Sequence, residues 1–329
     1  MGELIDTFGR KAVNLRISVT DRCNFRCRYC MPEEGMKWLE RDDLLTFEEI
    51  RRLVGIFASL GVTRIRLTGG EPLMRKELWK LVGMLHALPG IHDIALTTNG
   101  FFLKEQASDL VKAGLNRINV SLDALDPVTF NKMARRDYFD RTWEGIEEAI
   151  RLGARPIKLN AVLIRGINDA EIPRFVELAQ TKPVIVRFIE FMPIGKDDGW
   201  SNEKVVTTNE VIEAINAIAR IVPIPRDGTR APADRYVFEN GKGEVGFISS
   251  VSEPFCGDCD RVRITSDGKF RTCLFALKET DLRSLIRNGT SDGDIARLLV
   301  GAVYEKEEGH LINRPGFVRP DRTMSQIGG

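Results

Sequence analysis

Three cysteines in the run TDRCNFRCRYC constrain this chain more than any other feature. Cys23, Cys27 and Cys30 follow a C-x3-C-x2-C spacing, which places three thiolates in one short loop. A structural zinc site needs four protein ligands, and neither a histidine nor a fourth cysteine lies nearby in the sequence. A [4Fe–4S] cluster held by three cysteines keeps one iron free to bind a small molecule, whereas electron-carrier clusters saturate all four irons. The spacing therefore favours a catalytic iron–sulfur centre.

Composition restricts the class of protein. The chain is 43% hydrophobic and 29% charged with a net charge of +1, which is typical of a globular protein and argues against a strong field for nucleic acid or membrane. No apolar run reaches the length of a membrane span, and the segment MGELIDTFGR lacks a secretory signal. We therefore expect a cytoplasmic protein that binds neither nucleic acid nor a membrane.

Strand and helix patterns alternate along the first two thirds of the chain. Strands are predicted at residues 14–20, 64–68, 94–98, 117–122, 157–164 and 184–191. Helices are predicted between them, at about 46–60, 73–88, 103–113, 127–133, 142–152 and 169–180. Such βα repeats predict a parallel sheet closed or partly closed as a barrel, with the active site at the carboxyl ends of its strands.

The pattern changes after the loop at residues 195–202. Thr208 is expected to cap a helix that ends near Arg220. The later predictions are hairpins at 234–249 and 261–275, helices near 281–288 and 293–305, and an irregular tail. We place a domain boundary near residue 222, which divides the chain into residues 1–222 and 223–329.

A second cysteine triad straddles the later hairpin. Cys256, Cys259 and Cys273 have the spacing C-x2-C-x13-C, and the hairpin returns the third thiolate beside the first two. Zinc would need Asp258 or Asp260 as a fourth ligand, whereas a second [4Fe–4S] cluster with an open iron needs no other residue. The spacing alone leaves both readings open.

Arginines on the strand after Cys259 bear on that choice. Arg261 and Arg263 alternate with Val262, so both guanidinium groups lie on one face of the strand beside the metal. Two arginines next to an open iron suit a phosphorylated, nitrogen-rich ligand. We therefore favour the second cluster.

The first triad resembles the signature of the radical S-adenosylmethionine (SAM) superfamily. Within it, the chain resembles the GTP 3′,8-cyclase family over nearly its whole length. The resemblance rests on NLRISVTDRCNFRCRYCMP, LTGGEPLMR, LTTNG, NVSLDAL, FIEFMPIG, FCGDCDRVRITSDGKFRTCL and MSQIGG. It implies an α/β fold, a partial (β/α)6 TIM-like radical SAM barrel with a C-terminal α+β domain that carries a second iron–sulfur cluster.

The resemblance also implies roles for individual residues. The cofactors would be two [4Fe–4S] clusters, one on each cysteine triad, and SAM. The SAM contacts would be Tyr29, Gly70, Ser121 and Met192. The GTP contacts would be Arg16, Arg66, Thr97, Lys158, Arg261, Val262 and Arg263. Catalytic roles would fall to Arg261, Arg263, Gly328 and Gly329, because the tail would enter the open side of the barrel.

The implied reaction is the first step of molybdenum cofactor biosynthesis, the conversion of GTP to (8S)-3′,8-cyclo-7,8-dihydroguanosine 5′-triphosphate. A 5′-deoxyadenosyl radical would take hydrogen from C3′ of the ribose, and C3′ would then attack C8 of guanine. A small electron donor such as flavodoxin or ferredoxin and a downstream cyclic pyranopterin monophosphate synthase would be partners, with a homodimer as an open alternative.

Other readings are a radical SAM peptide-modifying enzyme with an auxiliary cluster, a zinc-stabilised binding protein and an electron carrier. Arg16, Arg66, Thr97 and Lys158 fall on four predicted strands, and the charged residues among them independently favour an anionic ligand. Buried cations are costly unless they face a polar cavity.

Overall fold

One twisted sheet organises the molecule. The computed structural model describes residues 2–154, 156–195, 199–226 and 232–328. Within these residues, twelve strands form a single sheet in the order β12-β11-β10-β1-β2-β3-β4-β5-β6-β9-β8-β7. The α/β fold and its barrel are thereby confirmed.

The predicted strands of the first two thirds form the central part of this sheet. Their bounds are β1 (Asn14–Ser18), β2 (Arg64–Thr68), β3 (Asp93–Thr98), β4 (Arg117–Ser121), β5 (Ile157–Leu163) and β6 (Val184–Glu190). Each pairs in parallel with the next along the chain. Their carboxyl ends therefore meet at one rim of the barrel, as the βα repeat predicted.

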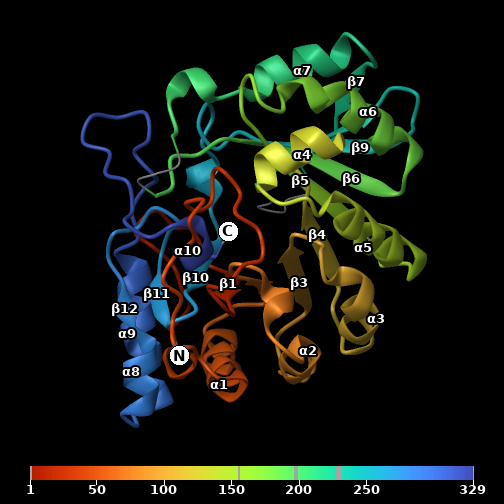
Figure 1. Cartoon of the computed structure of the whole chain (residues 1–329). Helices are drawn as coiled ribbons and strands as arrows, with labels where there is room; N and C mark the ends of the chain where they lie inside the picture. The colour runs from red at the N-terminus through yellow and green to blue at the C-terminus, as the bar shows by residue number, and fades with distance from the viewer. Residues whose placement is uncertain (1, 155, 196–198, 227–231, 329) are drawn as a thin grey trace.

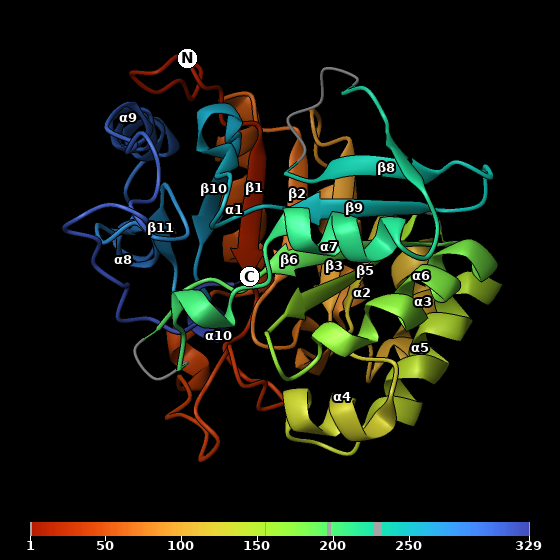
Figure 2. The same cartoon turned by 90° about the horizontal axis from the view of Figure 1, so that it is seen from above.

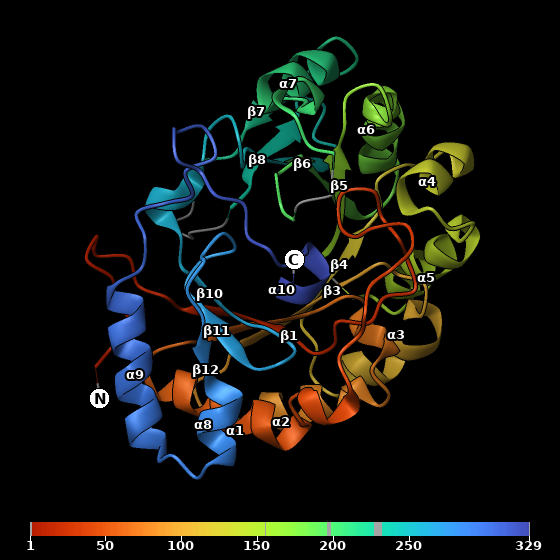
Figure 3. The ribbon, with the colours of Figure 1, turned by 60° about the vertical axis from the view of Figure 1, so that its left-hand side comes forward.

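Helices cover the outside of this barrel (Figures 1 and 3). The first six are α1 (Phe47–Ser59), α2 (Leu78–His86), α3 (Leu103–Lys112), α4 (Pro127–Ala134), α5 (Phe139–Arg151) and α6 (Ile172–Thr181). The predicted capping box of Thr46 and Glu49 opens α1. Apolar helix faces and the outer face of the strands make one large core, in which Leu53, Phe57 and Phe175 are fully buried.

The later strands lengthen the barrel at both edges. They are β7 (Ile221–Pro223), β8 (Asp234–Phe238), β9 (Glu244–Ile248), β10 (Arg261–Ile264), β11 (Lys269–Arg271) and β12 (Thr280–Asp281). The two hairpins are confirmed, but β9 also pairs in parallel with β6, and β10 with β1. The sheet therefore runs on across residue 222, where the proposed domain boundary stays a prediction.

The remaining helices are α7 (Thr208–Asn216), α8 (Leu282–Arg287), α9 (Asp292–Tyr304) and α10 (Met324–Ile327). Thr207, not Thr208, caps α7, because the Thr207 side chain accepts the Glu210 N–H and Thr208 N–H donates to Glu190 instead. Among the described residues, no helix is long and apolar enough to span a bilayer.

The tail was expected to be irregular, and this is wrong for α10. A capping box of Thr323 and Gln326 starts this short helix. Ser325 and Ile327 are buried. Seen from above and from the side, α10 lies inside the ring of strands rather than on its surface (Figures 2 and 3).

Candidate active site

One cavity in the barrel interior brings both cysteine triads together. The predicted residues that line it are Arg16, Cys23, Cys27, Tyr29, Cys30, Arg66, Gly70, Thr97, Ser121, Met192, Cys256, Cys259, Arg261, Arg263 and Cys273. These residues come from both halves of the chain. The cavity is therefore enclosed by the continuous sheet as a whole rather than by either half.

The first triad lies beyond the carboxyl end of β1, in a loop held by the segment after β2. Gly70 N–H donates to Thr20 O at 2.8 Å, and Glu71 N–H donates to Arg22 O at 2.8 Å. A Cβ on Gly70 would lie 2.4 Å from the carbonyl oxygens of Asp21 and Arg22. The Gly-Gly-Glu run is thus needed for close approach of two backbones.

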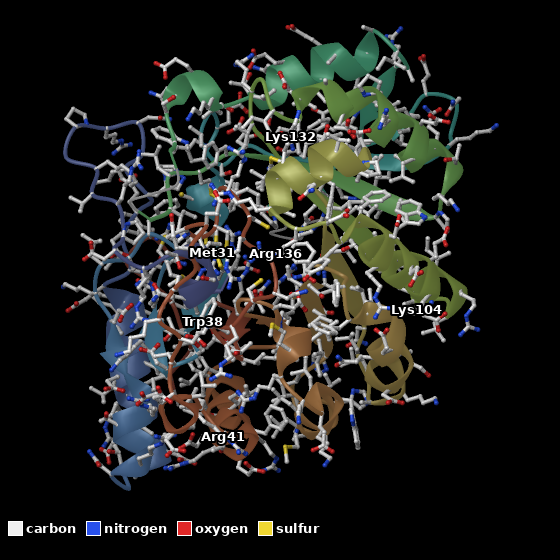
Figure 4. All side chains as sticks on the ribbon, viewed as in Figure 1. Met31, Trp38, Arg41, Lys104, Lys132 and Arg136 are labelled. Carbon is white, nitrogen blue, oxygen red and sulfur yellow. The ribbon has the colours of Figure 1, made fainter. Side chains whose placement is uncertain are left out.

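The end of α4 holds the other side of the same loop. Arg28 N–H and Nε donate to Met133 O at 3.0 Å and to Lys132 O at 2.6 Å. These carbonyls have no partner within their own helix, so the cysteine loop satisfies them. In Figure 4 the loop, marked by Met31 and Trp38, lies between α4, marked by Lys132, and the turn marked by Arg41.

The three thiols of this triad are free and suited to a metal cluster. Burial, with Glu71 nearby, raises the pKa of Cys23 to about 12, and burial beside Asp123 raises the pKa of Cys27 well above its ordinary value. A metal would therefore displace protons from these thiols. No group of three Cys, His, Asp or Glu side chains in the described residues converges as around a single ion. A cluster does not require this, because its thiolates bind different irons.

The second triad lies at the amino end of β10, the opposite end from the first triad. Cys259 precedes β10, and Cys273 follows β11, which runs antiparallel to β10. Burial disfavours the Cys259 thiolate, but Arg261 and Lys306 outweigh burial and lower the pKa of this thiol to about 6. This donor set of three thiols beside cations fits an anionic iron–sulfur cluster.

A layer of arginines crosses the barrel at the level between the triads. Arg16 on β1 is in register with Arg66 on β2 and with Arg263 on β10. Burial lowers the pKa of Arg66 to about 9, with Arg117 and Arg187 adding to the effect. Burial beside Arg66 and Arg261 also lowers the pKa of Arg16 well below its ordinary value.

Arg16, Arg66 and Arg263 form no ion pair with a carboxylate among the described residues. The Nε atoms of Arg16 and Arg66 are buried without a hydrogen-bond partner among the described residues. Like charges so close together repel one another, and burial weakens their solvation. The layer is therefore poised for a ligand with several negative charges.

Three predicted residues in the described part of the chain do not line this cavity. Lys158 lies on β5 near the layer, where burial and then Arg187 lower its pKa to about 7. Val262 points into the hydrophobic core, so only its backbone remains for a ligand. Gly328 O accepts a hydrogen bond from Arg263, and Gly328 packs on Ser18 and Thr68. Gly329 lies outside the described residues.

Three further lining residues were missed from the sequence: Arg187, Asn160 and His310. Arg187 is 7% exposed, and burial, then Arg117, lowers its pKa to about 10. A charged residue within the predicted strand 184–191 was the signal that could have identified it, as for Arg16. His310 follows the last helix predicted before the tail and carried no local signal.

The predicted SAM contacts surround the first triad. The Tyr29 hydroxyl donates to Asp123 at 2.8 Å, and Asp123 in turn accepts from Val162 N–H at 2.9 Å. Ser121 ends β4, and Met192 packs against the small apolar cluster around Ile194 and Ile327. Burial raises the pKa of the Cys30 thiol, and the nearby backbone N–H of Ser325 in α10 opposes this effect. The tail helix thus contacts the first triad directly.

Comparison with known proteins matches two family descriptions. "Radical SAM superfamily" covers residues 17–179, and "Molybdenum Cofactor Synthesis C" covers residues 184–312. A relative from Rhodopirellula baltica named "GTP 3′,8-cyclase" is 44% identical, covering 99% of this chain and 92% of its own. Another of that name from Streptomyces coelicolor is 45% identical, covering 99% of this chain and 96% of its own.

A solved structure shares the fold. Streptococcus suis SuiB bound to S-adenosylmethionine superposes with a TM-score of 0.63, over 94% of this chain and 77% of that one. The two sequences are 15% identical. The likeness therefore supports the barrel architecture alone.

Proposed function

Because the chain belongs to the GTP 3′,8-cyclase family of the radical SAM superfamily, we propose that it converts GTP to (8S)-3′,8-cyclo-7,8-dihydroguanosine 5′-triphosphate. This radical SAM lyase reaction is the first step of molybdenum cofactor biosynthesis. A peptide-modifying activity has no comparable support, since the buried cations suit a polyphosphate better than a peptide backbone.

The observation that carries the proposal is the arginine layer between two cysteine triads in one cavity. SAM would bind at the carboxyl ends of the strands, beside Cys23, Cys27 and Cys30. GTP would lie across the layer, with its base toward Cys256, Cys259 and Cys273. A radical transfer between two ligands requires that both be held in a fixed orientation in one enclosed space.

Residues of the chain supply binding and orientation. When bound, the first cluster would supply the electron that splits SAM into methionine and a 5′-deoxyadenosyl radical. Tyr29, Gly70, Ser121 and Met192 would hold SAM against it. Arg16, Arg66, Thr97 and Lys158 would hold the triphosphate, with Arg187 added to this set. Arg261 and Arg263 would neutralise charge near the reacting nucleoside.

The tail belongs to this site in our proposal. Gly328 accepts from Arg263, so the tail would fix the Arg263 guanidinium relative to GTP. The proposed partners are a small electron donor such as flavodoxin or ferredoxin and a cyclic pyranopterin monophosphate synthase that receives the product. A cytoplasmic location and assembly as a homodimer are proposed with them.

Anaerobic incubation of the reconstituted protein with SAM, dithionite and GTP tests the proposal. Mass analysis should find a cyclised nucleotide with the mass of the product together with 5′-deoxyadenosine. Release of 5′-deoxyadenosine without any change in GTP would overturn the proposed substrate. Reactions without SAM provide the control.

Variants of the two triads should fail in different ways. Cys27→Ala should abolish SAM cleavage, because a cluster that lacks one thiolate cannot keep its open-iron geometry. Cys259→Ala should remove GTP turnover while the first cluster keeps its spectroscopic signature. Normal GTP conversion by protein that carries one cluster would contradict the role of the second triad.

A further inference from the structure

A buried ammonium group lies against the second cysteine triad. Lys306 follows α9 and is 4% exposed. Its Nζ donates to the backbone oxygens of Cys259 at 3.3 Å and Arg261 at 2.9 Å. The same Nζ lies 3.7 Å from Cys259 Sγ, within hydrogen-bonding reach of sulfur. No motif in the sequence analysis included this lysine.

The charge of Lys306 has no carboxylate partner among the described residues. Arg10 also binds the triad loop, because its guanidinium group donates to Cys256 O at 2.7 Å. Unlike Lys306, however, Arg10 has a carboxylate partner, Asp6, at 2.6 Å. A buried cation with carbonyl partners alone is costly, since carbonyl dipoles compensate only part of its lost hydration. A negative charge within reach of Nζ would offset that cost, and the thiolate of Cys259 is the nearest group able to carry one.

The residues that follow Lys306, up to His310, pack against Cys256, the first cysteine of the triad. Burial raises the pKa of the Cys256 thiol, and the nearby backbone N–H of His310 opposes this effect. A Cβ on Gly309 would lie 2.9 Å from Cys256 Cβ and 3.1 Å from Cys256 Sγ. Residues 306–310 therefore pack against two of the three cysteines of the triad. The Lys306 ammonium is the charged group of this packed segment.

We propose that Lys306 is a positioning residue of the second cluster, whose ammonium stabilises the cluster's reduced form through Cys259. The inference rests on the second [4Fe–4S] cluster of the proposed function. A cluster held by three thiolates is anionic and gains one more negative charge when it accepts an electron. A fixed cation and a hydrogen bond to a ligand sulfur favour that more negative state and raise the reduction potential.

A higher reduction potential of the second cluster would matter for the last step of the proposed reaction. In the proposed reaction, the nucleotide takes up one electron and one proton after ring closure to reach the dihydro product, and the second cluster, when bound and reduced, would supply that electron. Lys306 would keep that cluster reducible by the same donor that serves the first. Arg261 faces the cavity from the other side of Cys259, with Nη2 at 3.5 Å from the sulfur.

Redox titration of the anaerobic holoenzyme, followed by electron paramagnetic resonance, tests this proposal. The variants are Lys306→Gln, which keeps donor groups but loses the charge, and Lys306→Arg, which keeps the charge. Lys278→Gln is the matched control, because Lys278 is exposed and pairs at 3.6 Å with Glu305, the neighbour of Lys306. Repeating the titration in a Cys23→Ala background isolates the signal of the second cluster.

Lys306→Gln should shift the second cluster to a more negative potential, with the first cluster unchanged, while Lys306→Arg and Lys278→Gln leave both where they were. Failure of Lys306→Gln alone to take up the second cluster, with uptake by Lys306→Arg, would also support the role of the charge. An unchanged potential in Lys306→Gln, or loss of the cluster from both Lys306 variants, would overturn it. Iron and sulfide analysis of the unaltered chain separates these results from failure of the proposed function, which would appear as a single cluster.

Discussion

At the scale of residues, the interior of the barrel concentrates positive charge. Arg263, Arg16 and Arg66 occupy one level on three adjacent strands, and Arg187 and Lys158 continue the charge on β6 and β5. Burial lowers the pKa of each of these cations, and neighbouring cations add to the effect, as Arg66 does for Arg16 and Arg187 does for Lys158. A bound polyanion reverses this effect, so proton uptake should accompany GTP binding.

Lys158 should make GTP affinity depend on pH. Its pKa is about 7 in the ligand-free protein, against ~10.4 in an unfolded chain. Above about pH 7 the free protein has lost this proton, and GTP must recover it, so affinity should fall by up to about tenfold per pH unit. The lowered pKa of Lys158 also affects folding. Between about pH 7 and about pH 10 the unfolded chain binds more protons than the ligand-free fold, so the free energy of unfolding should rise with pH over this range.

Calorimetric titration with GTP at several pH values above about 7 measures this slope. Lys158→Arg is the matched variant, because it keeps the charge at every pH and should flatten the profile while it preserves binding. Lys158→Met should also flatten the profile, with weaker binding near neutral pH. A Lys158→Arg profile as steep as that of the unaltered chain would contradict the assignment and leave the ionisation of GTP as the cause.

At the scale of elements, the barrel derives its function from strands that are distant in sequence. β10 pairs in parallel with β1, so Cys259 before β10 and Cys23 after β1 lie at opposite ends of neighbouring strands. The short helix α10 lies inside the ring and contacts Cys30 through Ser325. The tail thus packs against the first triad on one side and Arg263 on the other.

The tail contact should be sensitive to a single methyl group. Gly328 has φ of 83°, and a Cβ there would lie 2.9 Å from Thr68 Cγ2. Gly328→Ala, or removal of Gly328 and Gly329, should lower GTP cyclisation at least tenfold, about 1.4 kcal/mol in the barrier, because Arg263 loses its fixed partner. Cyclised nucleotide formed per minute is the measurement, with iron content recorded for each variant.

Gly316→Ala is the control that separates the effect of the Gly328 contact from the effect of backbone strain at a positive φ. Gly316 has φ of 87° in the same terminal segment, but a Cβ there would meet nothing within 4 Å. Its cyclisation rate should stay near that of the unaltered chain. Equal rates for Gly328→Ala and Gly316→Ala would mean that the tail is not part of the site.

At the scale of the whole molecule, the two ends of the chain are joined across the second triad. Arg10 donates to Cys256 O at 2.7 Å and to Glu307 O at 2.6 Å, and it also contacts Glu308 O. Thr7 N–H donates to Tyr304 O at 3.3 Å. The N-terminal segment therefore helps to shape the second cysteine triad, more than 240 residues away.

Arg10→Met should destabilise the protein by about 3 kcal/mol or more, because it leaves Asp6 as an unpaired buried carboxylate. Thermal unfolding of the anaerobic protein should show a lower midpoint, and iron content should fall toward one cluster. Lys11→Met is the neighbouring control, since Lys11 pairs with Glu3 at the surface, where such pairs contribute ~0–1 kcal/mol. Equal midpoints for the two variants would show that Arg10 does not secure the fold.

Local pattern was enough to predict the βα repeat, the cysteine loops and the capping box at Thr46. Each depends on side chains within a few residues of one another, where hydrophobic period, capping and spacing act directly. The same locality explains why short runs were enough to propose the triads as metal ligands. Roles for Tyr29, Ser121, Met192 and the tail came from resemblance and stay predictions.

Tertiary structure alone decided how these parts meet. Parallel pairing of β9 with β6 and of β10 with β1 spans long stretches of chain, and its register is set by the packing of the curved sheet rather than by nearby residues. Only that pairing places Arg263 beside Arg16 and turns two separate triads toward one cavity. The same holds for Lys306 and Arg187, because their burial and the charges around them arise only once these distant strands have paired.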